Sequence, residues 1–160
     1  MKKIVGIFVI LFLVGLVACT SDAQKEREKK IAQKKVEKEN LAPASERITL
    51  DNKGVGPIKD LQLAEVIDQE MVKKGMKTFK TNCSACHKID KRFIGPSPQG
   101  IMKRRSPEWI MNMILDPKLM TEEDRCAKDL LIEFNGAAMA NQNLTEEQAR
   151  EILEYFRTLD

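Results

Sequence analysis

The chain has 160 residues, a formal net charge of +3 and an aromatic content of 5%. This length accommodates one modest domain together with accessory segments. The small net charge lacks the strong basic bias that nucleic-acid-binding surfaces need, so we expect no nucleic-acid partner.

The first 18 residues have the pattern of an export signal. Two lysines follow the initial methionine, and the apolar run "IVGIFVILFLVGLVA" is too short and wrongly flanked for a membrane-spanning helix. The run ends at Cys19, and polar residues follow at once. This arrangement resembles a bacterial lipoprotein signal, in which the cysteine is lipidated and becomes the first mature residue. A chance cysteine and an uncleaved anchor are the alternatives. We expect the folded part to face the periplasm, attached to a membrane whose identity stays open.

Residues 19–68 are predicted to form a tether. The stretch "KEREKKIAQKKVEKEN" is almost entirely charged and has too few apolar side chains to build a core. Prolines and glycines interrupt the sequence that follows it. A flexible chain of about 48 residues has a typical end-to-end distance of ~40 Å, which would let a small domain reach neighbouring complexes. The last part of this segment is also compatible with lying on the domain.

Residues 69–160 are predicted to form a small all-α domain. Ile67, Met71, Gly75 and Phe79 recur every four residues, which indicates a helix that ends just before a pair of cysteines. No β-type alternation occurs in this half of the sequence. We therefore expect four helices joined by irregular loops.

The other three helices are predicted from their capping residues. One begins at Ser106, with Pro107 in its first turn, and ends at an Asp-Pro pair. The next begins at Thr121, has acidic residues in its first turn and closes at an Asn-Gly pair. The last begins at Thr145, and Gln148 three residues later completes a capping box.

The pentapeptide "CSACH" contains Cys83, Cys86 and the only histidine of the chain, His87. A structural zinc site needs four ligands, and the domain has only one other cysteine, Cys126, which we expect to be buried on a helix face. A thioredoxin-like dithiol follows a strand, which the preceding sequence does not predict. Covalent haem attachment meets every requirement, because the two thiols bond the porphyrin as thioethers and the imidazole binds the iron. We therefore predict one covalent haem c.

The sixth iron ligand is expected to be a methionine. A second histidine does not exist in the chain, so bis-histidine ligation is excluded. The methionines after the haem motif are Met102, Met111, Met113, Met120 and Met139. Most methionines in a helical domain fill gaps in the core. Met139 lies in the loop "NGAAMANQNLTEEQ", whose small and polar residues suit a segment draped across a flat porphyrin. We therefore predict Met139 as the axial ligand, with Met120 next.

From about residue 68 to residue 160 the sequence resembles the class I c-type cytochromes, which are small monohaem electron carriers. The matching features occur in the family's order: Gly75 and Phe79, then "CSACH", then Gly95 and Pro96, then the methionine loop and a final helix. One departure is Ala140, because the family often has a proline directly after the methionine.

The resemblance implies roles for several residues. The carbonyl of Pro96 would accept a hydrogen bond from the second nitrogen of His87 and fix the tautomer of this ligand. The helix that contains Gly75 would cross the last helix near Tyr155. Trp109 would pack near the haem edge with its N–H on a propionate, or serve only in the core.

The predicted domain is nearly neutral. Residues 69–160 include 15 basic and 14 acidic side chains, so we expect no strong electrostatic steering of partners. Arg104 and Arg105 would either partner the haem propionates or remain solvated.

These expectations describe an electron carrier and not an enzyme. With His87 and Met139 on the iron, no open site remains for a substrate. The resemblance implies a quinol-oxidising complex as electron donor, and a terminal oxidase or a nitrogen-oxide reductase as acceptor. We expect a monomer held at the membrane by the lipid on Cys19. The alternative is a gas-binding sensor or small haem enzyme with an open sixth iron site. The missing distal histidine and the 73 residues after the haem motif count against this alternative.

Overall fold

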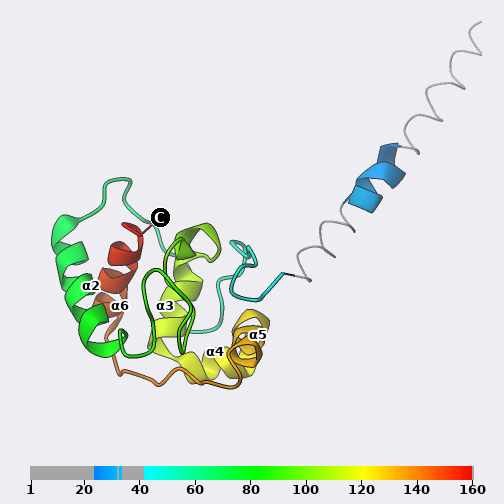
Figure 1. The fold of residues 1–160 in the computed structure, drawn as a ribbon. Helices are drawn as coiled ribbons and strands as arrows, with labels where there is room; N and C mark the ends of the chain where they lie inside the picture. Colours follow the sequence, from blue (N-terminus) through cyan, green and yellow to red (C-terminus); the bar gives the residue numbers. More distant parts are fainter. Residues whose placement is uncertain (1–23, 32, 34–41, 160) are drawn as a thin grey trace, which may run out of the picture. The chain divides into compact units, whose positions relative to one another are not determined.

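The structure is a computed structural model that describes residues 24–31, 33 and 42–159 (Figure 1). It divides into two compact units, Met1–Ala42 and Pro43–Asp160. Residues 24–31 and 33 of the first unit are helical and exposed. The predicted export signal and Cys19 lie outside the described residues. Within the described part of the chain, no helix is long and apolar enough to cross a membrane.

The second unit is helical, as predicted. Its only β feature among the described residues is an isolated parallel bridge between Thr49 and Arg105. The elements in chain order are α2 (Gln69–Asn82), the short 3-10 helix η1 (Ile101–Lys103), α3 (Pro107–Leu115), α4 (Pro117–Glu123), α5 (Arg125–Glu133) and α6 (Glu146–Phe156).

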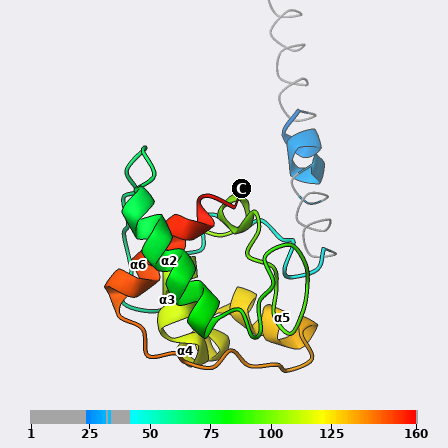
Figure 2. The same ribbon diagram turned by 60° about the vertical axis from the view of Figure 1, so that its left-hand side comes forward.

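Helices α2 and α6 lie side by side in both ribbon views (Figures 1 and 2). Their backbones pass close to each other at Gly75, where a β-carbon would overlap the carbonyl group of Glu151 and lie 2.8 Å from the amide nitrogen of Ile152. The resemblance implied a crossing near Tyr155, which lies one turn after these contacts. The Tyr155 ring instead packs against Phe79, with ring centroids 5.8 Å apart.

Helix α3 lies in the core, and its predicted cap is confirmed. The Ser106 hydroxyl accepts a hydrogen bond from the amide of Trp109, and Pro107 occupies the first turn. The capping box of α6 is also confirmed, because the Thr145 and Gln148 side chains each accept from the other's backbone N–H.

The predicted cap at Thr121 is wrong. Thr121 lies inside α4, and its hydroxyl donates to the carbonyl of Pro117 one turn earlier. Asp124 caps the next helix, α5, because its carboxylate accepts from the amide of Ala127 at 2.9 Å. One predicted helix is therefore two short ones, since Pro117 starts a new helix and Asp124 interrupts it.

The segment 43–68, called the strap below, belongs to the second unit. The sequence predicts a tether here, with its last part compatible with lying on the domain, and a domain that starts at residue 69. The compact unit begins 26 residues earlier, at Pro43. Buried polar side chains of the helices hold the strap. The carboxylate of Glu108 accepts from the amide of Leu61 at 3.1 Å. The strap also contacts α5, because Cys126, which is half-buried, lies with its Sγ 3.8 Å from the Thr49 hydroxyl.

Asn112, at the centre of α3, anchors the strap. Its side chain is fully buried. Its Oδ1 accepts from the amide of Ile58 at 3.0 Å, and its Nδ2 donates to the carbonyls of Ile58 and Lys53 at 2.9 and 3.0 Å. Gly56 passes so close that a β-carbon there would lie 2.7 Å from the Asn112 Cγ.

Replacing this anchor is expected to destabilise the folded domain. Asn112→Ala leaves one N–H and two carbonyls of the strap without their partners, at about 1–3 kcal/mol for each group that water does not reach. We expect a loss of about 3 kcal/mol in the free energy of unfolding, measured by urea titration of the holoprotein. Asn141→Ala is the control, because Asn141 is exposed and bonds only a neighbouring loop amide. Equal stability of the two variants would show that the Asn112 side chain does not stabilise the domain by holding the strap.

Candidate functional site

The haem motif lies where α2 ends. The chain turns back on itself there, with the amides of Cys86 and His87 donating to the carbonyl of Cys83 at 3.0 and 2.9 Å. Cys83 is half-buried and Cys86 is exposed. Burial, followed by the nearby Cys86, raises the pKa of the Cys83 thiol to about 11. Among the described residues, no group of three or more His, Cys, Asp or Glu side chains is placed to hold a metal ion.

The His87 imidazole is oriented by the loop that follows it. Its Nδ1 lies 2.8 Å from the carbonyl oxygen of Pro96, so the hydrogen bond expected from the resemblance is present. Because the Pro96 carbonyl can only accept, Nδ1 is the ring nitrogen that carries the proton in this contact, and Nε2 keeps a lone pair for a metal. Gly95 is required beside the ring, because a β-carbon would lie 2.5 Å from the His87 Cε1. The amide of Gly95 also donates to the carbonyl of Cys86 at 3.0 Å.

A largely apolar cleft opens from the motif into the core. Side chains from α2, α3, α5 and α6 form its walls. The principal apolar lining residues are Phe79, Ile110, Met113, Ile114, Leu130, Leu131, Ile152 and Phe156. Cys83, Cys86 and His87 line the same cleft.

Met139 also lines this cleft, on the loop between α5 and α6. That loop follows a backbone reversal in which Asn135 and Gly136 both have positive φ angles, 56° and 76°. A left-handed conformation at two successive residues suits Asn and Gly and turns the chain away from α5. Of the sequence candidates, Met113 lines the cleft as well, from within α3.

The second-ranked candidate, Met120, lies elsewhere. It is fully buried in α4, and its sulfur accepts a hydrogen bond from the amide of Val55 in the strap at 3.1 Å. Gly54 packs against its methyl end, where a β-carbon would lie 2.7 Å from Cε. Met120 is not among the residues that line the cleft. The structure therefore gives Met120 a role in anchoring the strap.

Trp109 is a buried lining residue of the cleft. Its indole N–H donates to the carboxylate of Asp124 at 2.9 Å, and it is therefore not free for a propionate as suggested. Asp124 also caps α5 and accepts from the Asn52 side chain at 2.7 Å. The sequence did not indicate a role for Asp124, because an acidic residue in what looks like a helix interior gives no sign of a contact with the Trp109 indole.

The two arginines next to α3 differ in burial, although both line the cleft. Arg104 is half-buried and donates to the carbonyl of Gln99 at 3.0 Å. Arg105 is buried, and its Nε has no hydrogen-bond partner. Neither side chain is simply solvated.

These residues fit a haem c. The cleft combines two thiols for thioether bonds, an imidazole with a fixed tautomer, a thioether sulfur from a separate loop, and apolar walls for a porphyrin. The unpartnered Nε–H of Arg105 supplies a donor for a carboxylate.

Comparisons with known proteins agree with this fit. The model of a family described as Cytochrome c matches residues 72–160. The structure is similar to "Cytochrome c from rhodothermus marinus", with a TM-score of 0.63 and 41% sequence identity over 74% of this chain and 94% of that chain. An engineered form of that protein bound to a carbene intermediate is similar too, with a TM-score of 0.61, 41% identity, and coverage of 74% and 95%. No match was found among curated proteins.

Proposed function

Because this chain belongs to the cytochrome c family and carries a covalent haem c, we propose that it is a lipid-anchored electron carrier with His87 and Met139 as iron ligands. The family supports haem-based electron transfer in general. The ligand pair, the periplasmic location and the respiratory role are the proposed refinements. The observation that carries the ligand pair is that both residues line one cleft from separate segments.

Haem c supplies an iron that changes between two oxidation states by one electron. The chain's residues hold that group and set its environment. Cys83 and Cys86 would fix the porphyrin, and the Pro96 carbonyl keeps His87 in the tautomer that presents Nε2. A thioether at the sixth position favours the ferrous state and raises the reduction potential relative to bis-histidine ligation. With His87 and Met139 both holding the iron, no site for a substrate would remain, and the chemistry would be outer-sphere electron transfer.

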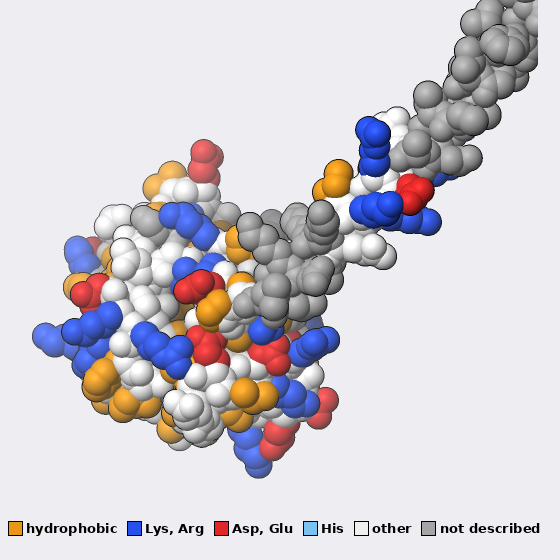
Figure 3. Space-filling view, turned by 45° about the vertical axis from the view of Figure 1, so that its right-hand side comes forward, with side chains coloured by type: hydrophobic (Ala, Val, Ile, Leu, Met, Phe, Trp, Pro, Cys, Tyr) orange, Lys and Arg blue, Asp and Glu red, His pale blue; other side chains and the backbone are white. Residues whose placement is uncertain are grey.

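The proposed partners are redox proteins that meet the domain briefly at a membrane surface. A quinol-oxidising complex would donate the electron, and a terminal oxidase or nitrogen-oxide reductase would accept it. The surface shown in Figure 3 interleaves basic, acidic and hydrophobic side chains, which suits transient encounters better than a tight complex. We propose a monomer attached to the membrane through lipidated Cys19.

The alternative is a haem protein with an open sixth position. The engineered relative that holds a carbene intermediate makes this alternative concrete. In this chain Met139 lines the cleft, which favours its sulfur as the sixth iron ligand over an open sixth position. One experiment separates the two.

Met139→Ala is expected to abolish the weak far-red absorption band that reports an iron–sulfur bond in the oxidised holoprotein. The reduction potential should also fall, by part of the roughly 0.8 V range over which axial ligands tune haem. Met120→Leu is the matched control, because this methionine lies outside the cleft, and it should keep the band. A parent protein that lacks the band and binds carbon monoxide readily on reduction would replace the electron-carrier proposal with the open-site alternative.

A further inference from the structure

Within the described part of the chain, hydrogen bonds hold the loop that carries Met139 only at its two ends. At its start the amide of Gly136 donates to the carbonyl of Leu131 in α5 at 2.8 Å, and at its end the loop meets the Thr145 cap of α6. Among the described residues, no hydrogen bond joins residues 138–144 to any other segment. The position of Met139 in the cleft therefore depends on packing and on the contacts that fix the start of the loop.

Arg92 holds the start of this loop. Its Nη1 donates to the Oε1 of Glu133 at 2.8 Å, and its Nη2 donates to the Glu133 carbonyl at 2.6 Å. Its guanidinium carbon lies 4.0 Å from the centre of the Phe134 ring, which is buried and lines the cleft. Glu133 is the last residue of α5, and Phe134 is its C-cap. One side chain thus contacts both residues from which the Met139 loop departs.

Both sides of this contact are themselves fixed. The loop that contains Arg92 is tied to the haem motif, because the amide of Gly95 donates to the carbonyl of Cys86 at 3.0 Å. The Glu133 carboxylate also accepts from the amide and the hydroxyl of Ser45 in the strap, both at 2.7 Å. The contact therefore connects the haem motif, the strap and the start of the Met139 loop.

The contact is stronger than an ordinary surface ion pair. The Arg92 side chain is 53% exposed, and an exposed ion pair alone contributes little to stability. Here the partner Glu133 is only 14% exposed, and the guanidinium adds a bond to a backbone carbonyl and a cation–π contact with Phe134. A lysine would keep the charge but lacks the planar fork that makes these contacts together.

We propose that Arg92 is a positioning residue, which clamps the start of the Met139 loop and so keeps the Met139 sulfur on the haem iron. Arg92 is not among the residues that line the cleft, so it acts through the loop and not on the haem. The role at the iron rests on the proposed function, in which Met139 is the sixth ligand. The hold of Arg92 on the loop does not depend on that ligand.

The first measurement is the affinity of imidazole for the ferric holoprotein. Added imidazole competes with Met139 for the iron, so its affinity includes the free energy of moving the loop away. Arg92→Gln removes the charge and the planar fork, and we expect imidazole to bind about tenfold more tightly, which corresponds to about 1.4 kcal/mol. Arg92→Lys should also bind imidazole more tightly than the parent, by a smaller factor.

The second measurement is amide hydrogen exchange at residues 134–137, followed by mass spectrometry. These amides donate to carbonyls of α5 or of the turn that follows it, and they exchange when the start of the loop opens. We expect about tenfold faster exchange in Arg92→Gln, since the same contacts oppose this opening. This measurement needs no iron–sulfur bond.

Lys91→Gln is the matched control, because it removes the same charge from the neighbouring position. Lys91 is exposed and forms no hydrogen bond or ion pair within the described part of the chain. Its imidazole affinity and its exchange at residues 134–137 should stay within about twofold of the parent, as for most surface substitutions.

The outcomes separate this inference from the proposed function. In a parent protein that shows the far-red band, an unchanged imidazole affinity or unchanged exchange in Arg92→Gln would overturn the inference. Equal changes in Lys91→Gln would overturn it as well, because the effect would then come from charge alone. A parent protein without the band would refute Met139 as the ligand, and exchange at residues 134–137 would still decide whether Arg92 holds the loop.

Discussion

Gly75→Ala is expected to destabilise the holoprotein by at least about 2 kcal/mol. An alanine in a helix interior is normally favoured over glycine by about 1 kcal/mol. At this position the added methyl group would overlap the carbonyl of Glu151 and press on the amide of Ile152. Both are backbone groups of α6 and have no rotamer by which to move away. The resulting overpacking is expected to cost more than about 3 kcal/mol, at the upper end of what inserted methyl groups cost in packed cores.

The consequence should extend to the haem site, because α2 ends at the haem motif. The Phe79 ring on α2 packs against Tyr155 and Phe156 of α6, at centroid distances of 5.8 and 5.7 Å. Moving the helices apart would loosen these contacts one turn before Cys83. We therefore expect a low yield of attached haem as well as a lower urea midpoint, and a larger loss for Gly75→Val. Lys77→Ala, an exposed change in the same helix, should alter stability by less than about 0.5 kcal/mol. A Gly75→Ala protein as stable as the parent would refute the close contact.

The predictable parts of this protein are those whose signals are local. The haem motif needs only the spacing of Cys83, Cys86 and His87, and the caps at Ser106 and Thr145 need only residues within one turn. The cap at Thr121 was a false local signal. Pro117 starts a helix as readily as it stops one, and Asp124 competes as a better cap three residues after Thr121.

The sequence allowed the last part of the strap to lie on the domain, but the contacts that hold the strap could not be predicted, because they join residues far apart in the sequence. Glycines and a proline near residue 55 indicate a flexible linker when read alone. In the structure, Gly54 and Gly56 allow the chain to pass against Met120 and Asn112. Local signals are also what could be predicted of the site. A loop of small residues indicated Met139, which lines the cleft. Nothing in the sequence indicates that Arg105 donates to the carbonyls of Ala44 and Arg47.

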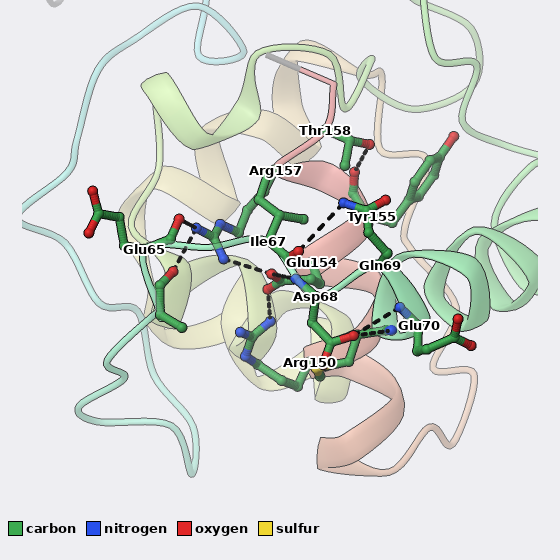
Figure 4. Close-up of polar contacts among 12 residues, drawn as sticks. Glu65, Ile67, Asp68, Gln69, Glu70, Arg150, Glu154, Tyr155, Arg157 and Thr158 are labelled. Atoms are coloured by element: carbon green, nitrogen blue, oxygen red, sulfur yellow. Dashed lines mark hydrogen bonds and ion pairs between the residues drawn. The ribbon is translucent and has the colours of Figure 1, made fainter.

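Glu154 on α6 fixes the other end of the strap, and we expect a large effect from its loss. The side chain is 1% exposed. Its Oε1 accepts from the amide of Asp68 at 2.9 Å and from Arg157 at 2.7 Å, while Oε2 pairs with Arg150 (Figure 4). Removing one member of a buried ionic group typically costs 3–5 kcal/mol, because the remaining charges stay buried and unpaired. Since Arg150 and Arg157 are 20% and 14% exposed, we expect Glu154→Gln to cost about 3 kcal/mol, at the low end of that range.

The pH dependence of stability should change in the same variant. Burial alone would raise the pKa of Glu154, but the Asp68 amide and the Arg150 and Arg157 guanidinium groups outweigh it and hold the pKa below its ordinary value. At a pH between the two pKa values, the unfolded chain therefore binds more protons at this residue than the folded protein does. The contribution of Glu154 to the free energy of unfolding is fully present above the unfolded-state pKa, and it is lost as the pH falls through the folded-state pKa.

Urea titrations of the holoprotein across the acidic range check both effects. The parent should lose stability more steeply than Glu154→Gln as the pH falls below about 4.3, the ordinary pKa of glutamate, so that the two curves converge in acid. Glu70→Gln is the matched control. Glu70 pairs with Lys73 at 2.6 Å, about the Glu154–Arg157 distance, but the two side chains are 75% and 68% exposed. An exposed pair of this kind contributes about 0–1 kcal/mol to the free energy of unfolding. Equal losses in the two variants would show that burial does not strengthen the ion pairs of Glu154. Parallel pH curves for Glu154→Gln and the parent would show the same.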